Sequence, residues 1–189
     1  MLSRMSDPTS PGPLDDTLVL SDRLPLRWQT LGDAPPATEL AHWDRRNVEV
    51  LHALLALDEG SRLGEEGGEP LAQEMLRLER KLDFVLDLLA RALGERLEVP
   101  APVDLRLSER GLQWAADPTI EPGTWLELEL HLSDRYPIPL RLCARVVTAS
   151  AEGCAATFTG VSEGGRDILA KLIFRAHRRG ISRRSEEHR

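Results

Sequence analysis

Apolar and polar residues alternate in three segments of the second half of the chain. The apolar positions are Val103, Leu105 and Leu107, then Leu126, Leu128, Leu130 and Leu132, then Leu140, Leu142, Ala144 and Val146. A period of two predicts strands that bury one face, so Glu127, Glu129 and His131 between them are expected at the solvent. Residues 150–153 predict a hairpin turn, and residues 154–161 predict the strand that returns from it.

Between residues 37 and 98 the spacing changes to that of helices. The first helix is expected after the chain break at residues 32–36, with Thr38 as its N-cap. Its inward positions recur every three or four residues: Leu40, Trp43, Asn47, Val50, Leu54 and Leu57. The buried asparagine in this series is expected to fix the register of a helix pair.

The second helix, expected from Leu71 to Ala92, has the most regular pattern in the sequence. Its three heptads have no polar residue at a core position: Met75, Leu82 and Leu89 take position a, and Leu71, Leu78, Val85 and Ala92 take position d. Leucines at flanking positions 86, 88 and 93 widen the stripe, which favours a bundle of more than two helices. We therefore expect a homo-oligomer, a tetramer rather than a dimer, and helix orientation stays open.

Two arrangements of these helices fit the pattern. A helix of about 24 residues extends for about 36 Å, which is more than a small barrel can cover. The favoured prediction is an intermolecular bundle that contains the heptad core positions together with Asn47, Val50, Leu54 and Leu57 of the first helix. The alternative is a helical hairpin folded onto the barrel of the same chain.

The order of elements predicts an α+β fold in which strands joined by short turns close into an antiparallel barrel. The predicted regions are a disordered N-terminus (1–16), a first strand (17–31), an inserted pair of helices (37–98), the rest of the barrel with a C-terminal helix (101–181) and a basic, polar tail (182–189). Pro25 predicts an edge position or a bulge in the first strand. Ser162 is expected to cap the last helix.

Charge and composition narrow the class of protein. The 24 Lys and Arg face 31 Asp and Glu, and this net charge of −7 argues against a nucleic-acid partner. Seven of the basic residues and one acid lie within residues 166–184, as either a solvated helix face or a contact surface. No segment has the roughly 18 apolar residues of a membrane span, and no signal peptide is evident, so we expect a cytoplasmic location.

No pattern of catalytic or metal-binding residues stands out. The sequence has no GxxxxGK, GxGxxG or HExxH, and its five histidines are scattered. We therefore expect neither an enzyme nor a metal protein. Cys143 and Cys154 are interpreted as reduced, packed thiols, and a bridge between them stays open.

From Asp104 onward the chain resembles a PilZ domain. The resemblance rests on LRLSERGLQW (105–114), the alternating strands, CAATFTGV (154–161) and the closing helix, with DRLPLRWQ (22–29) as the first strand. It implies a six-stranded antiparallel barrel of a family in which many members bind cyclic di-GMP. It also implies two ligand motifs, an RxxxR near the first strand and a [D/N]xSxxG early in the barrel.

The two motifs name the candidate ligand residues. Arg23 and Arg27 match the first, and Ser108 and Gly111 match the second, in which Arg106 replaces the Asp or Asn. The planar guanidinium group of an arginine can donate paired hydrogen bonds to a phosphate or to the edge of a guanine base. The resemblance predicts an oligomeric regulatory protein of motility, pilus or virulence signalling that contacts an unidentified protein partner and lacks the usual nucleotide binding. The alternative is a genuine cyclic di-GMP receptor that binds through these residues.

Overall fold

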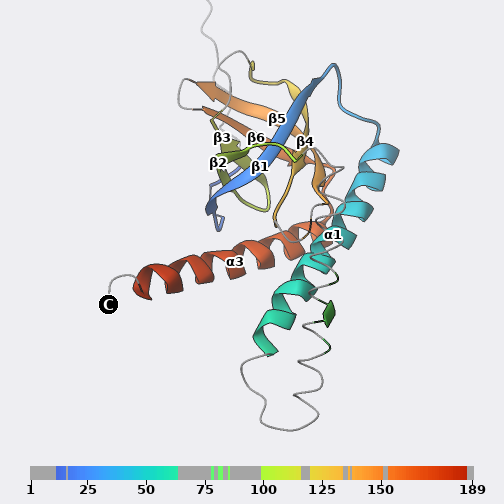
Figure 1. Ribbon diagram of the computed structural model, residues 1–189. Coiled ribbons are helices and arrows are strands. Elements are labelled where there is room, and N and C mark those ends of the chain that lie inside the picture. Colours follow the sequence, from blue (N-terminus) through green and yellow to red (C-terminus); the bar gives the residue numbers. More distant parts are fainter. Residues whose placement is uncertain are drawn as a thin grey trace, which may run out of the picture.

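The protein folds as a closed barrel of six antiparallel strands (Figure 1). The computed structural model describes residues 12–15, 17–63, 78, 81–82, 85, 99–115, 120–133, 136, 138–150 and 153–186. The elements are β1 (Leu20–Leu31), α1 (Ala37–Leu63), β2 (Pro102–Leu107), β3 (Gly111–Trp114), β4 (Trp125–Leu130), β5 (Leu140–Ser150), β6 (Gly153–Thr159) and α3 (Glu163–Glu186). Around the barrel the strands follow the order β1-β2-β3-β6-β5-β4. This confirms the six-stranded PilZ-like barrel.

The long strand β1 closes the barrel because it pairs with two neighbours in turn. Residues 20–25 pair with β2, and residues 26–31 pair with β4. Pro25 lies where the partner changes and faces Pro102, and its carbonyl accepts a hydrogen bond from the backbone N–H of His131 at 3.1 Å. A residue without an N–H fits this position, because the ladder is interrupted there.

The alternating strands build the core as the sequence predicts. The inward-facing apolar residues of β2, β3 and β4 and of β5 as far as Val146 are buried or half-buried, and Leu107, Trp114 and Leu128 are among the most deeply buried. The outward positions do not all reach solvent, however. Glu127 and His131 were expected there, and both are buried.

The helix α1 and the start of α3 pack on each other and on the barrel. Val50, Leu51 and Leu54 of α1 join Leu169 and Ile173 of α3 in one cluster with the barrel residues. Val50 and Leu54 were assigned to an oligomer interface, as were Asn47 and Leu57. In the structure Asn47 is also buried within the chain, and Leu57 is half-buried. Steps of three and four are common to all amphipathic helices, so the spacing cannot tell these two locations apart.

The predicted second helix lies mostly outside the described residues. This applies to Leu71, Met75, Leu89 and Ala92. Of the region between α1 and β2, the residues Leu78, Lys81, Leu82 and Val85 are described, and all four are helical. Among the described helices none has the length and apolar character of a bilayer span.

Both cysteines are buried free thiols. They lie on the adjacent strands β5 and β6, but the register pairs Cys143 with Thr159 and Cys154 with Ala149, several rungs away. Burial, together with the charge of Glu127, raises the pKa of Cys143 to about 11, and burial also raises the pKa of Cys154. Thiols of this kind are poorly reactive, as the sequence interpretation of packed thiols implies.

Candidate functional site

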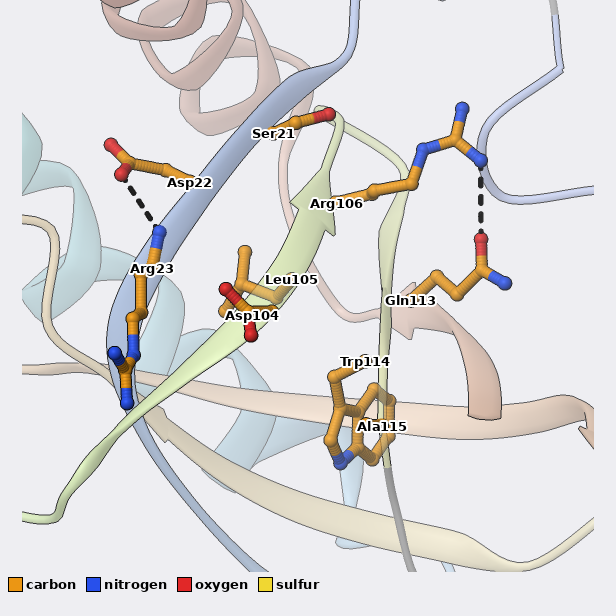
Figure 2. Close-up of a pocket in the computed structure, with 9 residues that line it drawn as sticks. All are labelled: Ser21, Asp22, Arg23, Asp104, Leu105, Arg106, Gln113, Trp114 and Ala115. Atoms are coloured by element: carbon orange, nitrogen blue, oxygen red, sulfur yellow. Dashed lines mark hydrogen bonds between the residues drawn. The ribbon is translucent and has the colours of Figure 1, made fainter. Parts of the chain in front are cut away.

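A groove of about 500 Å³ runs over the strands β1, β2 and β3 (Figure 2). Two of the candidate ligand residues, Arg23 and Arg106, line it. Arg23 stands opposite Asp104 in the β1–β2 register, and its Nε donates to the backbone O of Pro102 at 3.4 Å. The Arg106 guanidinium donates to Gln113 Oε1 at 3.3 Å. The fold therefore brings these two arginines to one surface.

The charges of the groove are balanced rather than positive. Asp22 and Asp104 line it together with the two arginines, and the Asp22 carboxylate accepts the backbone N–H of Arg23 at 2.7 Å. An anion that approached either guanidinium would also meet these carboxylates. Such an arrangement gives little net attraction for a dianionic ligand.

Arg27, the second arginine of the RxxxR match, is not among the residues that line the groove. It lies beyond the point where β1 changes its partner, so its neighbour is β4 rather than β2. Its guanidinium pairs with Glu129 at 3.5 Å, and both side chains are exposed. The two arginines of the motif therefore face different strands and do not converge.

Ser108 is fully buried in the turn between β2 and β3. Its hydroxyl lies 2.6 Å from the backbone O of Pro13 and accepts the backbone N–H groups of Arg110 and Gly111 at 3.1 and 3.2 Å. A serine hydroxyl has one proton to donate and two lone pairs. Contacts within the chain use this capacity, so the serine of the second motif acts here as a turn residue.

Gly111 is required by close packing. A Cβ at this position would collide with the backbone O of Ala156 on β6 and would lie 2.6 Å from Cβ of Pro13. Pro13 itself is buried, and residues 12–15 form a turn closed by the Asp15 carboxylate on the Gly12 N–H at 2.7 Å. Within the region 1–16, for which disorder was predicted, residues 12–15 form this turn, and the Ser108 hydroxyl holds Pro13 there.

A second polar cluster, which the sequence did not reveal, joins α1 to the barrel. Glu127 on β4 accepts hydrogen bonds from Gln29 Nε2 at 2.8 Å and from Arg141 Nε. The Arg141 guanidinium also lies 3.9 Å from the ring centroid of Trp43 on α1. Burial would raise the pKa of Glu127, but the hydrogen bonds from Arg141 and Gln29 and the charge of Arg141 lower it below its ordinary value.

Residues 160–164 read Gly-Val-Ser-Glu-Gly and match the GxSxG pattern of serine hydrolases, so the expectation that the sequence lacks this motif was wrong. The structure gives Ser162 the role of a helix cap. Its Oγ accepts the backbone N–H of Gly165 at 3.1 Å, and its own N–H donates to Asp44 Oδ1 at 3.0 Å. The expected capping of α3 by Ser162 is thus present, and Asp44 ties this junction to α1.

No candidate metal site is present among the residues that the structure describes. Within them, no group of three or more His, Cys, Asp or Glu side chains is placed to hold an ion. The candidate ligand surface is therefore the groove of Arg23 and Arg106. Gln113 on β3 is a further polar residue of this groove that the sequence analysis did not identify. Its position opposite Arg106 follows from the β2–β3 register.

Comparison with known proteins shows similarity to a family model and to a solved structure of a related protein. A family model described as an atypical PilZ domain, cyclic di-GMP receptor, matches residues 51–185. A crystal structure from Xanthomonas campestris is similar at 29% identity and a TM-score of 0.67, over 89% of this chain and 93% of that one. That pathogenic protein is described as a tetrameric PilZ domain self-assembled via an unusual helical bundle. No curated protein matches the chain.

Proposed function

Because the chain belongs to the family of atypical PilZ domains, we propose that it is a non-enzymatic regulatory protein that works as a homo-oligomer in cyclic di-GMP-related signalling. In this proposal the barrel is the regulatory module, and the helical region between α1 and β2 assembles it, as a tetramer rather than a dimer. The output is control of motility, pili or virulence from the cytoplasm, through contact with a protein partner of unknown identity.

The observation that carries the assembly is an exposed apolar stripe. Leu78, Leu82 and Val85 are helical, follow one another at steps of four and three, and are 55%, 62% and 57% exposed in the single chain. Burial of each such side chain contributes about 1.5–3 kcal/mol. Such a stripe buries the most apolar surface when it packs against the same stripe of another copy, as in a heptad bundle.

The similar Xanthomonas protein supports the same conclusion. It is described as self-assembling through a helical bundle, and the likeness covers most of both chains. For the present chain we assign the bundle to the heptad positions from Leu71 to Ala92. The first helix contributes less than its spacing suggests, since Asn47, Val50 and Leu54 are already buried within the chain.

Light scattering after gel filtration tests the assembly. We expect a mass near four times the chain mass of 21.1 kDa, and dissociation when Leu82→Asp places a charge in the bundle. Val147→Asp is the matched control, because Val147 is also an exposed apolar residue but lies on β5. A monomeric mass at all concentrations would refute the proposal.

Loss of the usual nucleotide binding is the second part of the proposal. It rests on the internal use of Ser108, the separation of Arg27 from Arg23, and the replacement at Arg106. Isothermal titration with cyclic di-GMP tests it, and we expect no binding in the micromolar range. Micromolar binding that Arg23→Ala and Arg27→Ala abolish would overturn it.

A genuine cyclic di-GMP receptor is the alternative function. The shared groove of Arg23 and Arg106, with Gln113 beside them, favours it. Two guanidinium groups and an amide can meet a phosphate and a guanine edge together. In that case titration would show binding that depends on Arg23 and Arg106 but not on Arg27. This pattern separates the groove from the RxxxR motif.

A further inference from the structure

The helix α3 differs from the rest of the protein in charge and position. In Figure 1 the helix begins beside α1 and then runs outward, away from the barrel, to the C-terminal end. Residues 166–184 contain seven Lys and Arg and one acid in a chain with a net charge of −7. Positive charge is therefore concentrated on one projecting helix of an otherwise acidic protein.

The outer side of α3 presents an aromatic ring between two cations. Lys171, Phe174 and Arg178 recur at steps of three and four, so they share one side of the helix, and all are exposed. Phe174 is 52% exposed, and the Arg178 guanidinium lies 5.9 Å from its ring centroid. The inner side is different: Leu169 and Ile173 are buried in the core. The fold thus uses only one face of α3.

We propose that the outer face formed by Lys171, Phe174 and Arg178 binds the surface of anionic lipid bilayers. Basic side chains are attracted to anionic headgroups, and an aromatic ring between them can enter the headgroup boundary. This inference goes beyond the proposed assembly, because it concerns where the assembled barrels are held.

The position of this face on α3 resolves an apparent conflict with the negative net charge. At physiological ionic strength, electrostatic forces between exposed charges fall off within about 8 Å. An α-helix with its side chains is about 10–12 Å across, and the proposed face lies on the side of α3 opposite Leu169 and Ile173, which pack in the core. The face can therefore approach a charged surface while most of the acidic barrel, behind the helix, lies beyond the range of strong repulsion.

Phe174 decides between classes of anionic partner. The backbone of a nucleic-acid duplex is bound through hydrogen bonds and charge, to which an exposed phenyl ring adds little. A bilayer boundary takes up both the ring and the cations. In the proposed oligomer several copies of α3 would meet one continuous surface, and this multivalency would strengthen the attachment.

Co-sedimentation of the full chain with vesicles tests the inference. We expect binding to vesicles of equal parts phosphatidylglycerol and phosphatidylcholine, little binding to phosphatidylcholine alone, and weakening by added salt. Lys171→Glu with Arg178→Glu should lower the partition coefficient at least about 30-fold, the loss of about 2 kcal/mol expected from removing two positive charges alone. Phe174→Ala should lower it by about tenfold. The matched control is Arg110→Glu with Arg145→Glu, which makes the same charge change on the barrel and should retain most of the binding.

Three results would overturn the proposal. The first is that the protein does not sediment with anionic vesicles. The second is that the α3 variant and the barrel control lose vesicle binding equally. The third is that Phe174→Ala binds vesicles as the parent protein does and polyglutamate competes with the vesicles. The last would assign the face to an acidic protein. Light scattering on the same samples tests the proposed assembly separately. A monomer that still binds anionic vesicles would contradict only the proposed assembly.

Discussion

Asn47 on α1 and Arg141 on β5 exchange two hydrogen bonds across the junction of helix and barrel. The Asn47 amide donates to the backbone O of Arg141 at 2.7 Å, and its Oδ1 accepts the Arg141 N–H at 2.9 Å. The Asn47 side chain thus satisfies the backbone N–H and C=O of Arg141, as a neighbouring strand would. Trp43, one turn earlier, covers the Arg141 guanidinium. These contacts fix the position of α1 on the barrel.

Replacement of Asn47 should therefore destabilise the protein. Asn47→Ala leaves a backbone N–H and a C=O without their partners, and each lost partner of a buried group costs about 1–3 kcal/mol. We expect a loss of about 2 kcal/mol or more in the free energy of unfolding, measured by urea denaturation at fixed protein concentration. Glu49→Ala on the exposed side of the same helix is the control, with a change within about 0.5 kcal/mol. Equal effects of the two substitutions would contradict the role given to Asn47.

The Glu127 cluster predicts a stability that depends on pH. Hydrogen bonds from Arg141 and Gln29 keep the folded-state pKa of Glu127 below its ordinary value of 4.5. At a pH between the folded-state and unfolded-state pKa values of Glu127, the unfolded chain binds more protons than the folded chain. The stability that the cluster contributes is therefore fully present above the unfolded-state pKa and is lost as pH falls through the folded-state pKa. Glu127→Gln should flatten that part of the profile of urea midpoints against pH. An unchanged acid limb in the variant would refute the assignment.

Gly111 and Gly164 should respond to alanine in opposite ways. A Cβ at Gly111 meets the backbone of β6 and Pro13, whereas a Cβ at Gly164 in the first turn of α3 has nothing within 4 Å. We expect Gly111→Ala to lower the free energy of unfolding by about 3 kcal/mol. Gly164→Ala should raise it by about 0.5 kcal/mol, since alanine restricts the unfolded chain. Thermal melting of both variants beside the parent protein provides the measurement.

The strands were predictable because each depends on a local pattern. The alternation through Leu126, Leu128 and Leu130 fixes which face is buried, whatever surrounds it. Pro25 was expected at an edge or a bulge, and it lies instead where β1 changes its partner from β2 to β4, another place where a strand residue can lack a ladder N–H. Ser162 was also predictable as a cap, because its hydroxyl acts on a residue three positions later.

Features that depend on which elements meet could not be predicted in this way. Glu127 alternates with leucines like any solvent-facing residue, and it is buried only because Arg141 and Gln29, distant in sequence, gather over it. The surroundings of the candidate ligand residues could not be predicted for a related reason. Arg23 and Arg27 are four residues apart in one strand, but the change of partner from β2 to β4 between them separates their surroundings. Ser108 matched a motif, and only the fold shows Pro13 at its hydroxyl.

Restoring the acidic residue of the second motif should not restore cyclic di-GMP binding. Arg106→Asp gives the residues 106–111 the full family pattern, and a sequence comparison alone would then predict a receptor. In the structure the change adds a third carboxylate to a groove that already holds Asp22 and Asp104, and it removes one of the two guanidinium groups. Ser108 would still be held by Pro13, and Arg27 would still pair with Glu129. Isothermal titration should therefore detect no micromolar binding, whereas a gain of affinity would show that position 106 alone disables the motif.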